Sequence, residues 1–155
     1  MADTITLRDE IDAILTGMTG VTYMRAKPDE ANLLLNQTKV TNCIAIHIDL
    51  TQFASMRTAG SYTYKVVPTQ VLFLYKNTHL SDRTSDVDTL IGQAEDKADE
   101  FYDRLIQSAV IEQSAPLDNP TYSRLEAYKR FDAITSGILF EWLVPIPRST
   151  YYCAT

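Results

Sequence analysis

A run of acidic side chains in the second half of the chain is the first candidate for chemistry. Five carboxylates lie within nine residues, in the order Glu95, Asp96, Asp99, Glu100 and Asp103. Carboxylate metal sites in helical bundles pair such groups with a histidine three residues after a glutamate, and this segment contains no histidine. The spacing therefore predicts no metal site. It favours a solvated helix face, and a second interpretation stays open, in which the face lines a channel through which a polyanion passes without sticking.

The histidines and cysteines form no catalytic pattern. His47 and His79 have no partner at a metal-ligand spacing. Cys43 and His47 share one face of a predicted strand, but their spacing of four residues separates them by roughly 13 Å, which is too far for a nucleophile and its base. We therefore expect both histidines to be structural, and the sequence predicts no catalytic, cofactor-binding or metal-binding residue.

One short motif invites a comparison with phosphatases. Residues 86–90 read Asp-Val-Asp-Thr-Leu, which resembles the Asp-x-Asp-x-Thr/Val nucleophile loop of haloacid-dehalogenase-type phosphatases. The fifth position is Leu90 instead of Thr or Val, and residues 78–85 separate the motif from the preceding predicted strand. We interpret the motif as the acidic first turn of a helix, where carboxylates complement the helix dipole.

Length and charge limit the classes of function. The chain has 155 residues, 45% of them hydrophobic, which is typical of about one globular domain. Its formal net charge is −6, and its 14 basic residues are scattered. Because binding to nucleic acid depends on clustered Lys and Arg, we expect no sequence-specific nucleic acid binding. No apolar run approaches the roughly 20 residues of a membrane span. Cys43 and Cys153 are expected to be reduced thiols, with a disulfide left open.

Hydrophobic periodicity predicts two helices and about four or five strands. The first helix is expected to begin at Thr6 and to be ended by Gly17 and Gly20, and the second to cover about 86–112. The strands are expected over Val21–Ala26, Val40–Leu50, Tyr62–Tyr75, Tyr122–Arg130 and Ile134–Ile146. Because several strands follow one another without an intervening helix, the order favours a mixed or antiparallel sheet. The predicted fold class is α+β, a two-layer sandwich of that sheet with two helices. It forms a single domain over 1–147, followed by a C-terminal tail or arm over 148–155.

Several positions carry more specific expectations. On strand 40–50 the face with Ile44 is expected to be well buried, and His47 is expected on the weaker face. Pro68 predicts a break or an edge position in its strand, and residues 51–61 are expected to form a loop. Inside a helix Gly92 costs about 1 kcal/mol relative to Ala, which a close backbone contact would explain. Strands that are apolar on both faces predict that the helices cover different faces, or that a neighbouring subunit covers one.

The order of these segments is similar to that of small tail-terminator and head–tail connector (neck) proteins of tailed bacteriophages. Four segments carry the resemblance: the amphipathic helix around Ile11–Leu15 that runs into Gly20–Tyr23, "TQVLFLYKN" (Thr69–Asn77), "LIGQAEDKADEFYDRLI" (Leu90–Ile106) and "AITSGILFEWLVPI" (Ala133–Ile146). The similarity covers most of the chain and is one of layout, without an invariant motif.

This resemblance implies a structural virion protein, not an enzyme, that has no cofactor and forms a homo-oligomeric ring of six or twelve subunits around the DNA path. The implied partners are other neck and tail proteins, on the connector, tail-tube or portal side, and DNA passes through the ring. The implied location is the neck or tail of the virion, after assembly in the cytoplasm of the bacterial host, with no membrane partner. The acidic charge fits a lumen through which DNA slides, since like charges repel.

Two kinds of position are candidates for the ring interface or the lumen. The first are the acidic side chains Glu95, Asp96, Asp99, Glu100 and Asp103, and the second are Tyr151 and Tyr152 on the tail, because tyrosine is common at interfaces. Loop tips over 51–61 and 114–122 are further candidates for subunit and partner contacts. Two alternatives stay open: a small cytoplasmic enzyme or ligand-binding domain, and a tube-terminator-like component of a phage-tail-related secretion apparatus.

Overall fold

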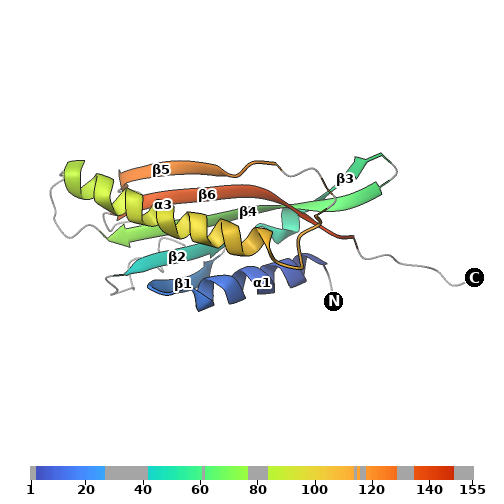
Figure 1. Cartoon of the computed structure of the whole chain (residues 1–155), viewed down its shortest axis with the longest axis horizontal. Helices are drawn as coiled ribbons and strands as arrows, with labels where there is room; N and C mark the ends of the chain where they lie inside the picture. The colour runs from blue at the N-terminus through green and yellow to red at the C-terminus, as the bar shows by residue number, and fades with distance from the viewer. Residues whose placement is uncertain are drawn as a thin grey trace, which may run out of the picture.

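A computed structural model describes residues 3–26, 42–60, 62–76, 84–113, 115, 118–128 and 135–148 of the chain. These residues form two α-helices, one 3-10 helix and six strands (Figure 1). The elements are α1 (Asp3–Gly17), β1 (Val21–Ala26), β2 (Cys43–Ile48), η1 (Thr51–Phe53), β3 (Ser55–Ala59), β4 (Tyr62–Lys76), α3 (Thr84–Ile106), β5 (Thr121–Tyr128) and β6 (Thr135–Ile146). The predicted tail residues Tyr151 and Tyr152 lie outside the described residues.

The six strands form one mixed sheet in the order β1-β2-β4-β6-β5, and β3 also pairs with β4. Strands β1 and β2 are parallel, and every other pair is antiparallel. The sheet packs against two helices, so the predicted α+β fold class is confirmed. The 15-residue strand β4 joins the parts of the sheet, since it pairs with β2, β3 and β6.

Both helices cover the same face of the sheet (Figure 1). The main core joins Leu7, Ile11 and Leu15 of α1 and the apolar stripe of α3 to one face of the strands. The expectation that the two helices cover different faces is therefore wrong. On the opposite face a smaller cluster gathers buried and partly buried side chains, which are Ile44, Ile46, Leu72, Leu74, Met24, Ile48, Leu125 and Leu139.

Aromatic rings fill the space between α3 and the sheet. Phe101 of α3 lies edge-on to Phe140 of β6, with ring centroids 5.3 Å apart, and 5.8 Å from Phe73 of β4. All three side chains are fully buried, and burying each contributes about 1.5–3 kcal/mol. Trp142 is buried as well, and its indole N–H donates to the carbonyl of Asp118 at 2.6 Å. The apolar strand β6 thus packs directly against the long helix α3.

The segment between β2 and β4 differs from the sequence prediction. Residues 51–61 were expected to be a loop, but they contain η1 and the short strand β3. Strand β3 pairs with the start of β4, and together they project beyond the rest of the sheet at one end (Figure 1). Its side chains are mostly exposed. Its sequence therefore shows no alternation of apolar and polar residues, which is the pattern that predicts a strand. Gly60, at a positive φ of 65°, lies at the turn.

The position of Pro68 combines both predictions made for it. Strand β4 continues through Pro68, so the predicted break is wrong. Along one edge, however, β4 pairs with β3 up to Val66 and with β2 only from Gln70. Pro68 therefore lies where that edge has no partner strand among the described residues, which is a position that tolerates a missing N–H donor.

The long helix is shorter than predicted and contains an exposed glycine. Helix α3 ends at Ile106 instead of about 112. The side chain of Gln113 donates to the carbonyl of Ile106 at 2.9 Å, which satisfies one of the acceptors left open at the helix end. A Cβ added to Gly92 would meet nothing within 4 Å, so the expected close contact is absent among the described residues. Its cost of about 1 kcal/mol has no compensation inside the described chain.

Candidate functional site

The predicted acidic residues lie on the outer side of α3. We call Glu95, Asp96, Asp99, Glu100 and Asp103 the acidic face. Four of them are exposed and Glu100 is partly exposed, while Ala94, Ala98, Phe101 and Leu105 of the same helix are buried. The helix thus turns one side to the core and presents carboxylates on the other side, as amphipathic periodicity predicts. The exposure of these side chains fits both interpretations of the face, the solvated one and the one that lines a channel.

Among the described residues, Glu100 is the one member of the acidic face that forms ion pairs with basic side chains of the same helix. Glu100 contacts the guanidinium of Arg104 at 3.0 Å and the ammonium of Lys97 at 3.9 Å. Lys97 also donates to the carbonyl of Thr19 at 2.7 Å, next to α1. Because both basic groups of α3 lie beside Glu100, their charge compensates mainly that one carboxylate.

Asp99 is held from the other side, by strand β5. It accepts a hydrogen bond from the hydroxyl of Tyr122, and burial together with this bond raises the pKa of that tyrosine well above its usual value. In the described part of the chain no ion pair involves Glu95, Asp96 or Asp103. These three carboxylates are therefore the part of the acidic face with most uncompensated negative charge.

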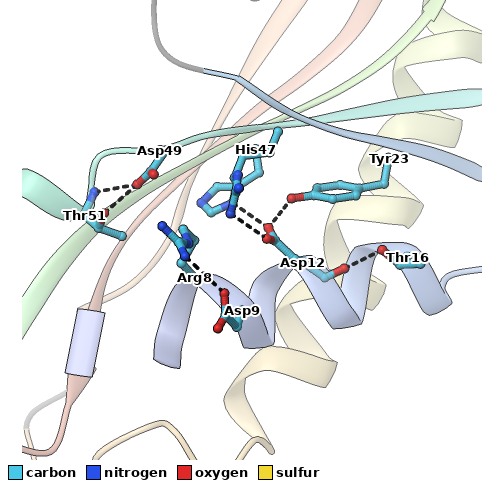
Figure 2. Close-up of polar contacts among 9 residues, drawn as sticks. Arg8, Asp9, Asp12, Thr16, Tyr23, His47, Asp49 and Thr51 are labelled. Atoms are coloured by element: carbon cyan, nitrogen blue, oxygen red, sulfur yellow. Dashed lines mark hydrogen bonds and ion pairs between the residues drawn. The ribbon is translucent and has the colours of Figure 1, made fainter. Parts of the chain in front are cut away.

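A second polar cluster lies between α1 and the parallel pair of strands (Figure 2). Asp12 of α1 accepts a hydrogen bond from the Tyr23 hydroxyl, and its other carboxylate oxygen lies 3.0 Å from the Arg25 guanidinium. Nδ1 of His47 lies 3.3 Å from Asp12 Oδ1. Tyr23 and Arg25 are two apart on β1, and Arg25 pairs in register with His47 on β2. Strand alternation therefore brings all three donors to one carboxylate.

His47 lies on a different kind of surface from the one expected. The sequence reading placed it on the weaker face of its strand, but that face packs against α1 and the main core, and His47 is only 2% exposed. The expectation of a weaker face is therefore wrong, because the helices lie over this side of β2. Burial lowers the pKa of His47, and its contact with Asp12 opposes this only in part. The imidazole is therefore neutral near pH 7.

The rest of this region is also held by local hydrogen bonds. Asp49 accepts from the backbone N–H and the hydroxyl of Thr51 at 3.0 and 2.6 Å. Burial alone would raise the pKa of Asp49, but these bonds lower it below its usual value. Nearby, Arg8 of α1 contacts Asp9 at 3.5 Å (Figure 2). No sequence pattern predicted this cluster, because Asp12 and His47 are 35 residues apart.

The polar cluster is built to hold elements together. Burial and the hydrogen bond to Asp12 raise the pKa of Tyr23, so its phenol stays protonated. Cys43, on the same face of β2, is fully buried, and burial raises the pKa of its thiol to about 12. A nucleophilic cysteine needs a lowered pKa and access to solvent, and Cys43 has neither. The donors around Asp12 therefore connect α1, β1 and β2.

An open pocket lies where β6 continues past the start of β5. Its volume is about 210 Å³, and its lining includes Thr69, Asp118, Glu141 and Trp142. Ligand pockets usually enclose about 300–1,000 Å³, so this one is small for a drug-sized ligand. Gln70 and Glu141 at its rim are hydrogen-bonded to each other at 2.9 Å. Two of the polar side chains at the pocket are therefore already hydrogen-bonded to each other.

Two kinds of feature are absent from the described residues. Among those residues no group of three or more His, Cys, Asp and Glu side chains is placed to hold a metal ion. None of the helices there combines the length and the apolar character needed to cross a membrane.

No protein-family model matches the chain, and no curated protein matches it significantly.

Proposed function

We propose that this protein is a structural component of a tailed-bacteriophage virion that forms a ring in the neck or tail around the path of the DNA. The observation that carries the proposal is the acidic face, which stands exposed along one side of the longest helix. Helix α3 carries seven carboxylates and only two basic residues. The resemblance in segment order to tail-terminator and connector proteins supports the same proposal.

Electrostatics explains why such a surface suits a DNA channel. Duplex DNA carries about one negative charge per 1.7 Å of its axis, and a wall of carboxylates repels it. A protein of net charge −6 therefore guides DNA without binding it. The protein acts by assembly, without a catalytic step, in the virion after assembly in the host cytoplasm. Its partners are copies of itself and the adjoining connector, portal-side or tail-tube proteins.

Reconstitution with tail tubes tests this function directly. Purified protein is added to tail tubes from phage particles that lack it, and the tube ends are imaged by negative-stain electron microscopy. We expect a ring at one end of each tube and restored joining of tails to DNA-filled heads. Tubes that remain bare at all protein concentrations, with no restored joining to heads, would contradict the proposed function.

A further inference from the structure

A second open hollow lies where the start of α1, the chain after α3 and the end of β6 meet. Its volume is about 170 Å³, and its described lining consists of Thr6, Ala109, Val110, Ile146 and Pro147. Ile146 is only 1% exposed, whereas Thr6, Ala109 and Pro147 are exposed. The hollow therefore joins a buried apolar side chain to the surface. We call it the α1–β6 hollow.

Hydrogen bonds fix the walls of the α1–β6 hollow. The hydroxyl of Ser108, in the chain after α3, donates to the carboxylate of Glu10 on α1 at 3.0 Å. The backbone N–H of Glu112 donates to the carbonyl of Pro145 on β6 at 3.0 Å. The chain after α3 is thus tied to α1 on one side and to β6 on the other. A group that enters the hollow finds it already formed, which lowers the entropic cost of binding.

The size and the chemistry of the α1–β6 hollow suit an aromatic ring. An apolar cavity of about 150 Å³ is large enough to bind benzene. The described lining contains no charged side chain, and its one hydroxyl is that of Thr6. A tyrosine combines a large apolar ring with a polar tip. Such a ring fits this lining better than a charged group does.

Strand β6 leads directly to the hollow, and the sequence continues beyond it. Pro147 lines the hollow and follows the last residue of β6. The tail, residues 148–155, reads Arg-Ser-Thr-Tyr-Tyr-Cys-Ala-Thr, and residues 149–155 lie outside the described ones. Because an extended chain spans about 3.3–3.6 Å per residue, Tyr152 can reach roughly 17 Å from Pro147.

The sequence around Pro147 disfavours entry of the tail into the hollow of its own chain. The prolines at 145 and 147 restrict Val144 and Ile146 to extended backbone. Residues 148–150 contain no Gly, Asn, Asp or Pro, and these residues favour a tight reversal. A tyrosine of the same chain would need such a reversal directly after Pro147. The hollow of another copy needs none.

We infer that one tyrosine of the tail, Tyr151 or Tyr152, inserts its ring into the α1–β6 hollow of a second copy of this chain. Adjacent side chains of an extended chain point to opposite sides, so only one of the two rings enters. This inference rests on the proposed ring and names a contact that joins its subunits. Tail and hollow are different surfaces, and such a heterologous contact closes into a ring when the rotation between subunits allows it.

The first test fills the hollow from within. Ala109→Leu places a larger apolar side chain at the lining, so we expect the association constant, measured by sedimentation, to fall at least about tenfold. Ala13→Leu makes the same change at an exposed alanine of α1 that does not line the hollow, and should leave association unchanged. Association of Ala109→Leu as tight as that of the wild type, or an equal loss in the control, would overturn the inference.

The second test removes the rings one at a time. Either Tyr151→Ala or Tyr152→Ala should weaken association at least about tenfold, and the other by less than about threefold. At the sensitive position, substitution by Phe keeps the ring and should restore most of the association. Two Ala variants that both associate normally, or a Phe variant as weak as the Ala variant, would overturn the inference.

The third test shows whose hollow the tail occupies. Ala109→Leu has an intact tail, and the double variant Tyr151→Ala/Tyr152→Ala has an intact hollow. At a concentration where each alone is monomeric, their equimolar mixture should form dimers of twice the 17.5 kDa mass of the chain. A mixture that stays monomeric would overturn the inference. So would a lower Tm of the double variant as a dilute monomer, because it would place the tail on its own chain.

These outcomes separate the contact from the ring. Closed rings that form normally in Ala109→Leu and in the double variant would leave the proposed function standing and remove the inferred contact. Open chains or dimers that these variants dissolve would support the contact and remove the ring. A wild-type chain that stays monomeric at every concentration would contradict both.

Discussion

Nδ1 of His47 on β2 lies 3.3 Å from Oδ1 of Asp12 on α1, across the boundary between the first helix and the sheet. The histidine is 2% exposed and the aspartate 24%. The same carboxylate accepts from Tyr23 and Arg25 of β1. One side chain of α1 therefore fixes the helix to both strands of the parallel pair.

Removing Asp12 should loosen this attachment. In Asp12→Ala, Tyr23 and His47 lose their shared acceptor, and a buried group left without its partner costs about 1–3 kcal/mol. We expect a fall of that size in the free energy of unfolding, measured by urea denaturation. Asp9→Ala, at an exposed carboxylate on the same helix, is the matched control and should change stability by less than about 0.5 kcal/mol. Equal losses in both variants would contradict this role for Asp12.

The stability of the fold should depend on pH through His47. Burial lowers its pKa in the folded state, so the unfolded chain binds the proton more readily. The contribution of His47 is therefore fully present above the unfolded pKa and is lost as pH falls, beginning near pH 6.5. We expect the free energy of unfolding to decrease from about pH 7 to pH 5.

A variant separates His47 from the carboxylates that titrate at lower pH. Asp12, Asp49 and Arg25 are the charged groups that influence its pKa. The lowered pKa of Asp49 affects stability only below about pH 4. His47→Gln should therefore flatten the slope between pH 7 and pH 5 and keep the loss at lower pH. An unchanged slope in this variant would show that another group titrates there.

Gly137 should tolerate no side chain. On β6 it pairs with Leu74 of β4, and a Cβ added to it would overlap the carbonyl oxygen of Phe73. Because backbone atoms in a central strand pair cannot move aside cheaply, Gly137→Ala should destabilise the fold by at least about 1–3 kcal/mol. Thermal unfolding measures the loss, and a Tm equal to that of the wild type would contradict the close approach of the two strands.

Gly92 should respond in the opposite direction. Its added Cβ would meet nothing within 4 Å, so Gly92→Ala gains helix propensity without a clash. We expect a gain of about 1 kcal/mol in the free energy of unfolding, measured on the dilute monomer. The pair of glycine variants thus compares the same substitution at an open and at a closed position. A loss of stability at Gly92 would reveal an intramolecular contact of this position.

Local patterns were enough to predict most elements of the fold. Strand Val21–Ala26 was predicted at its observed bounds, and the strands around Phe73 and Phe140 were placed to within one or two residues, because their apolar and β-branched runs are long. The amphipathic stripe of α3 likewise predicted which side holds the acidic face. These features depend on residues that are near one another in the sequence.

What the sequence could not predict depends on distant partners. Strand β3 is defined by its pairing with β4 and not by its own exposed residues. The cluster around Asp12 needs α1, β1 and β2 in place before its members meet. The face of Cys43 and His47 looked weak because small and polar residues occupy it, yet both helices pack over that side of the sheet. In each of these cases, contacts between elements that are distant in the sequence determine the structure.

The state of assembly in solution tests the central claim most directly. Mass photometry and cryo-electron microscopy of the purified full chain measure the mass and the shape of the assembled particle. The proposal predicts a closed ring with a central opening and a mass six or twelve times that of the 17.5 kDa chain. A compact 17.5 kDa monomer at every concentration, both alone and with tail tubes, would contradict it.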